Sequence, residues 1–132
     1  MKKIFLLFVM ALTIQACSPS LDSARMANTK WVLSEWPGRT IPVNAQATLN
    51  FDIDHKINGK SFCNGYGGNS SFENGRVKFS EIFGTKMFCT EFGDAETHFQ
   101  TDLQAVDALK MNGEKLQLLK DGQVMMVFVK AQ

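Results

Sequence analysis

The chain has 132 residues, with 14 Lys and Arg against 13 Asp and Glu. Two of the lysines lie within the first three residues, so the rest of the chain is close to neutral. The chain thus has no excess of basic residues of the kind that nucleic-acid-binding proteins use to contact phosphates. The length suits one domain with one hydrophobic core.

The N-terminus has the composition of a secretory signal peptide. Lys2 and Lys3 precede an apolar run from Ile4 to Ile14. A positive end followed by a short apolar stretch is typical of such a leader. The run covers about 11 residues, whereas a helix that spans a bilayer needs about 20. The sequence therefore predicts a signal peptide over residues 1–16.

The end of this leader carries a cysteine in a specific context. Ile14, Gln15, Ala16 and Cys17 resemble the lipobox of bacterial lipoproteins. The resemblance implies cleavage before Cys17 and acylation of that cysteine, and several acyl chains together anchor a protein stably. The alternative is ordinary cleavage after Ala16 that leaves a free thiol, but such cleavage favours a small residue where Ile14 stands.

The residues that follow the lipobox suggest a destination and a tether. Ser18 is not the aspartate that retains such lipoproteins in the inner membrane, so the resemblance implies the outer membrane of a bacterial envelope. Residues 17–28 are mostly polar and predict a lipidated tether. The predicted domain then covers residues 29–132.

Two cysteines remain in this domain, Cys63 and Cys89. An even number of cysteines in an exported protein favours a disulfide. The bridge would close a loop of roughly 25 residues and contribute about 3 to 4 kcal/mol. Two buried thiols that never meet are the alternative.

Short strands separated by turns dominate the rest of the chain. Residues 47–53 alternate between apolar and polar side chains, with Ala47, Leu49, Phe51 and Ile53 on one face, which indicates a half-buried strand. Asn-Gly and Asp-Gly pairs indicate hairpins. The glycine-rich residues 64–68 are predicted to be a tight turn. The other predicted strands are residues 30–36, 57–62, 69–73, 76–83, 108–111, 115–120 and 123–130.

One segment has helical periodicity instead. Between Thr90 and Ala108, the apolar residues Phe92, Phe99 and Leu103 recur at helical spacing. Carboxylates gather at the start of the segment, where they suit the positive end of the helix dipole. The sequence thus predicts a mainly antiparallel β fold with one packed α-helix, curled into a small barrel-like form.

The order of several motifs resembles the META domain family, to which heat-inducible bacterial proteins of the HslJ type belong. The resemblance rests on residues 31–33 (WVL), 47–52 (ATLNFD), 58–68 (NGKSFCNGYGG), 85–89 (TKMFC) and 113–118 (GEKLQL). It implies a compact β fold with one helix and a Cys63–Cys89 disulfide. It further implies links to heat shock and antibiotic tolerance, and no established enzymatic activity.

No catalytic, cofactor-binding or metal-binding constellation stands out. Cys63, Cys89, His55 and His98 lack the close ligand pairs of structural zinc sites. Along a helix, Cys89 and His98 would lie at least ~10 Å apart, too far for a nucleophile and its base to hydrogen-bond. We therefore expect no catalysis and no cofactor.

The remaining expectation is recognition by aromatic side chains in or near loops. Trp36, Tyr66 and Phe88 are the candidate partner surface, with core packing as the alternative for each. The predicted function is that of a non-enzymatic envelope lipoprotein, linked to stress, that binds another envelope protein or component.

Two other functions make distinguishable demands on the structure. A small barrel that binds an apolar molecule needs an internal cavity. An enzyme that uses Cys89 needs a free thiol at that position. A core filled by large side chains would count against the binding of an apolar molecule. The side chains expected to fill the core are Leu49, Phe51, Phe79, Phe99, Leu103 and Phe128.

Overall fold

The computed structural model describes residues 21–132. Cys17 and the predicted signal peptide lie outside the described residues. Residues 23–26, inside the expected tether, form the short helix α1 (Ser23–Met26). Met26 is buried in the hydrophobic core, so the folded domain begins before residue 29.

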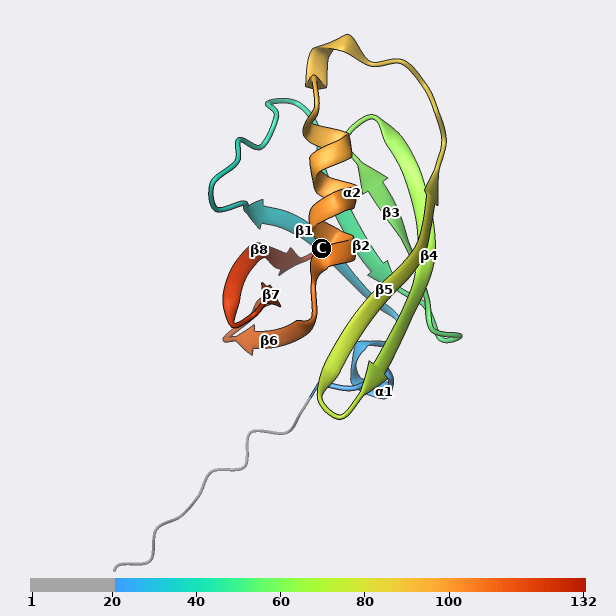
Figure 1. Ribbon diagram of the computed structural model, residues 1–132, viewed down its shortest axis with the longest axis vertical. Helices are drawn as coiled ribbons and strands as arrows, with labels where there is room; N and C mark the ends of the chain where they lie inside the picture. Colours follow the sequence, from blue (N-terminus) through green and yellow to red (C-terminus); the bar gives the residue numbers. More distant parts are fainter. Residues whose placement is uncertain (1–20) are drawn as a thin grey trace, which may run out of the picture.

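Eight strands within the described part form one antiparallel sheet with the order β5-β4-β3-β2-β1-β8-β7-β6. This confirms the predicted fold class of antiparallel β with one packed helix (Figure 1). The main helix is α2 (Ala95–Ala105), preceded by the 3₁₀ turn η1 (Thr90–Phe92). The strands are β1 (Thr29–Glu35), β2 (Thr48–Phe51), β3 (Lys56–Ser61), β4 (Asn64–Glu73), β5 (Arg76–Gly84), β6 (Ala108–Asn112), β7 (Lys115–Lys120) and β8 (Gln123–Lys130).

The sheet is curled but open, and its two edge strands approach each other at one point. The N–H of Val77 in β5 donates to the carbonyl of Asp107, just before β6, at 3.1 Å. Arg76 and Asp107 form an ion pair at 2.9 Å at the same place. Helix α2 lies between the two halves of the curled sheet (Figure 1).

Large apolar side chains fill the space between α2 and the sheet. Phe99 and Leu103 on α2 are fully buried, as is Phe128 on β8. Phe99 packs edge-on against Phe62 at 5.9 Å between ring centroids. Strand β8 lies between β1 and β7, as its apolar sequence predicted. Its consecutive residues Met126, Val127 and Phe128 point to alternate faces of the sheet and are all buried.

Hairpins form at all three predicted places, and two of them turn at the predicted pair. In the third, Asn112 pairs with Lys115, so the turn between β6 and β7 falls on Gly113 and Glu114. Asn74 and Gly75 both have positive φ, at 52° and 75°, and together they join β4 to β5 in the manner of a type I′ turn. Asp121 and Gly122 do the same between β7 and β8, with φ of 49° and 79°.

The predicted strand at residues 47–53 is too long. Strand β2 ends at Phe51, and the N–H of Asp52 donates to the carbonyl of Lys56 in a turn. Ile53 therefore leaves the apolar face of the strand and is 67% exposed.

The prediction of a tight turn at residues 64–68 is wrong. These residues open β4 and pair with both β3 and β5, and the chain reverses instead around Phe62, whose φ is 71°. The glycines permit close cross-strand packing. A Cβ on Gly67 would lie 2.9 Å from the ring of Phe83, and one on Gly68 would lie 2.7 Å from Ile82.

Candidate functional site

The candidate site is the loop of residues 85–89, which leaves β5 and leads to η1 (Figure 1). Its side chains Met87 and Phe88 are 62% and 92% exposed. Few large apolar residues among the described ones are this accessible, since burial of such side chains is the norm. We call this pair of residues the apolar tip.

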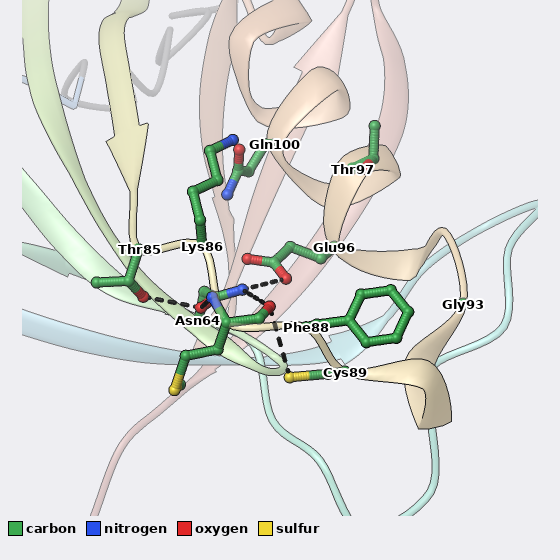
Figure 2. A pocket seen from close by; sticks show the side chains of 10 residues that line it. Asn64, Thr85, Lys86, Phe88, Cys89, Gly93, Glu96, Thr97 and Gln100 are labelled. Atoms are coloured by element: carbon green, nitrogen blue, oxygen red, sulfur yellow. Dashed lines mark hydrogen bonds between the residues drawn. The ribbon is translucent and has the colours of Figure 1, made fainter.

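Asn64, the first residue of β4, holds the loop in place. Its side-chain oxygen accepts hydrogen bonds from the Thr85 hydroxyl at 2.9 Å and from the Met87 N–H at 2.8 Å. Its side-chain nitrogen donates to the Met87 carbonyl at 3.1 Å and to Glu96 Oε2 at 2.8 Å. An amide side chain has two donor hydrogens and two acceptor sites, so Asn64 is fully satisfied. Figure 2 shows its place between the loop and α2.

A disulfide provides the second attachment. It joins Cys63, which directly precedes β4, to Cys89 at the end of the loop, with a Cα–Cα distance of 6.2 Å. That distance lies within the range that disulfides span. The thiols of the predicted pair thus meet, and neither is available as a nucleophile or metal ligand.

A polar recess lies beside the apolar tip. It has a volume of about 280 Å³ and is lined by Glu96, Thr97 and Gln100 of α2 together with the loop. Each Glu96 oxygen accepts one hydrogen bond, from Asn64 and from the buried Ser61 hydroxyl at 2.9 Å. A carboxylate has about four acceptor sites, so Glu96 retains capacity for a further donor.

The surroundings of the tip are acidic. Glu91, Asp94 and Glu96 follow it within a few residues, and Lys86 is the only lysine or arginine in the same stretch. None of the ion pairs found within residues 21–132 involves these three carboxylates. Within the described residues these three carboxylates therefore form no ion pair, although Lys86 lines the same recess as Glu96.

Two of the three aromatics predicted at the partner surface are in the core. Trp36 and Tyr66 are each 5% exposed. The Trp36 ring stacks on Phe62 at 5.7 Å, and the Tyr66 hydroxyl donates to the Thr48 carbonyl at 2.6 Å. Burial raises the pKa of the Tyr66 phenol. Both residues follow the core-packing alternative, and only Phe88 lies on the surface.

A partly buried ion pair between Arg39 and Asp102 was not predicted from the sequence. Arg39 holds the Asp102 carboxylate of α2 with two hydrogen bonds of 2.7 and 3.0 Å, and the Trp36 indole N–H donates to the same carboxylate at 3.0 Å. Burial raises the pKa of Asp102, but the bonds from Arg39 and Trp36 outweigh that effect and hold it below its usual value. This network ties the loop after β1 to α2.

The structure also places the residues that were considered for metal binding and for thiol chemistry. Within residues 21–132, no group of three or more His, Cys, Asp and Glu side chains could hold a metal ion. His55 and His98 are exposed, and Cys89 is in the disulfide rather than paired with His98. In the same part of the chain, no helix is both long and apolar enough to span a membrane.

Fold and site together define a small β domain with one helix that presents a cross-linked, apolar loop. The META domain model matches residues 24–132, and the chain therefore belongs to the META domain family. This family is not known for an enzymatic activity. None of the curated proteins matches the chain significantly.

Solved structures share the fold. A protein from Burkholderia xenovorans, solved by NMR, is 27% identical with a TM-score of 0.70, over 83% of this chain and 86% of that one. A DUF4847 family protein from Bacteroides vulgatus ATCC 8482 is 14% identical with a TM-score of 0.58, over 81% of this chain and 95% of that one. The second likeness concerns the fold alone.

Proposed function

We propose that this chain is a lipid-anchored protein of the bacterial envelope that binds another envelope protein and performs no catalysis of its own. The leader and Cys17 support the anchor, and Ser18 favours the outer membrane. The Cys63–Cys89 disulfide supports export, because disulfides persist in oxidising compartments.

A single observation carries the binding role: Phe88, which is 92% exposed, stands on a loop that a disulfide and the hydrogen bonds of Asn64 attach to the rest of the domain. An exposed apolar residue on a flexible loop would lose conformational freedom on binding, which weakens association. The disulfide and Asn64 remove that cost beforehand. A preorganised aromatic anchor is typical of interfaces.

The interior of the curled sheet argues against the alternative function, the binding of an apolar ligand inside the domain. Leu49, Phe79, Phe99, Leu103 and Phe128 are at most 2% exposed and occupy the space that such a ligand would need. Phe51, at 3%, packs with them against Phe79. We therefore place recognition on the outside of the domain.

Membership of the META domain family supports a stress-linked role, such as heat shock or antibiotic tolerance. In this role the protein would act as an accessory factor for another envelope component. Growth of a deletion strain after heat shock or antibiotic exposure, with and without the gene restored, tests this link directly.

The anchor is tested by the intact mass of the protein purified from membranes. We expect a chain that begins at Cys17, carries lipid, and gains alkyl groups on Cys63 and Cys89 only after reduction. A Cys17→Ser variant should lose membrane association. An unlipidated chain with free thiols at positions 63 and 89 would refute the anchor and the cross-linked site together.

A further inference from the structure

The N-terminal end of the described chain and the apolar tip lie at opposite ends of the domain. The described chain enters at residue 21 beside α1, whereas the loop of residues 85–89 and η1 lie at the far end of α2 (Figure 1). Only four residue steps separate Cys17 from Leu21, a reach of at most about 14 Å. On the proposed anchor, the α1 end therefore stays near the membrane while the tip points away from it.

The charge around the tip is also unsuited to a membrane surface. Three carboxylates, Glu91, Asp94 and Glu96, face one ammonium, Lys86, in the same stretch. Envelope membranes carry anionic lipids that attract basic segments and repel acidic ones. The position of Phe88 and the charge of its surroundings are therefore two independent arguments against insertion of this side chain into a membrane.

Resting on the proposed function, we infer that the partner is a protein with an apolar socket for Phe88, rimmed by lysine or arginine side chains. Phe88 and Met87 supply the apolar part of the contact. The carboxylates around them supply charge complementarity, which steers association and selects partners. The polar recess, which Lys86 also lines, presents the remaining acceptor sites of Glu96 to a hydrogen-bond donor of the partner.

The test is photo-cross-linking in living cells from a photoreactive amino acid placed at position 88 of the full chain. Ile53, which is 67% exposed between β2 and β3, is the matched control position. We expect an adduct with one protein from position 88 but not from position 53. Mass spectrometry of the adduct should place the cross-link beside lysine or arginine residues of the partner.

Charge reversal of the carboxylates that follow the apolar tip tests the basic rim inferred for the partner's socket. The paired substitutions Glu91→Lys and Asp94→Lys should reduce the yield of the adduct at least tenfold, and Glu91→Gln with Asp94→Asn by less. Unchanged melting temperatures of these variants would show that the domain is intact, because neither side chain is buried.

The outcomes separate the two proposals. Lipid adducts at position 88, or a protein adduct that survives charge reversal, would overturn the inference about the partner while leaving the anchor in place. Absence of the protein from the membrane fraction would instead refute the proposed function. A cross-link that maps to an acidic or uncharged region of the partner would also overturn the inference.

Discussion

Removal of the Cys63–Cys89 disulfide is the most direct perturbation of the site. The bridge spans 26 positions in the sequence. On the chain-entropy model, a loop of that length restricts the unfolded state enough to stabilise the fold by about 3.5 kcal/mol. The described domain has about 110 residues, for which 1 kcal/mol corresponds to about 4 °C in melting temperature. We therefore expect the Cys63→Ser, Cys89→Ser double variant to melt about 14 °C lower.

Thermal unfolding followed by circular dichroism measures this effect. The wild-type protein treated with reductant should reach the melting temperature of the double variant, and the double variant should not respond to reductant. The double variant is thus the control for any unspecific effect of the reagent. A decrease below about 4 °C, which corresponds to about 1 kcal/mol, would refute the chain-entropy reasoning for this loop.

Three further predictions concern polar contacts and close packing. Asn64→Ala should lower the free energy of unfolding by about 2 to 3 kcal/mol in urea titrations, because it leaves backbone groups and Glu96 without their partner; a loss under about 1 kcal/mol would contradict this. Asp102→Asn should lower the free energy of unfolding by about 2 kcal/mol at pH 7, because it weakens the charge-assisted hydrogen bonds from Arg39. Because the folded-state pKa of Asp102 is lowered, its contribution is present above the unfolded-state pKa of about 3.9 and is lost as the pH falls through the folded-state value. The difference between wild type and Asp102→Asn should accordingly shrink below about pH 4, and a constant difference would contradict the ion pair. Gly59→Ala should lower the free energy of unfolding by about 1 to 3 kcal/mol, because the new Cβ would overlap the backbone of β2. Gly65→Ala is the matched control in the same assay, since the Cβ at this position would make only ordinary contact.

The sequence by itself determined most of the local structure. The alternation of apolar and polar residues at 47–51 predicts a strand, because successive side chains of a strand point to opposite faces. The Asn74-Gly75 pair predicts a hairpin, because type I′ turns need positive φ at both central residues. The helix followed from the spacing of its apolar residues and from the carboxylates at its start, with Phe99 and Leu103 on its buried face. Two cysteines in the predicted domain left one possible internal pair.

Only the tertiary structure decided which aromatics reach the surface. Trp36 and Phe88 both stand next to predicted loops, and nothing local distinguishes them. The difference arises because the loop after β1 folds back over α2, where Asp102 lies 66 positions away in the sequence and accepts the Trp36 N–H. No element within residues 21–132 folds over Phe88, which remains exposed.

The role of Asn64 likewise depended on long-range assembly. As one residue of a glycine-rich stretch, it is a plausible turn former. Its four hydrogen bonds go to partners 21 to 32 positions away, which meet only after β4 pairs with β5 and α2 packs on the sheet. Periodicity and turn preferences depend on residues that are close in the sequence. The contacts of the site join residues that are distant in the sequence, and the curl of the sheet brings these residues together.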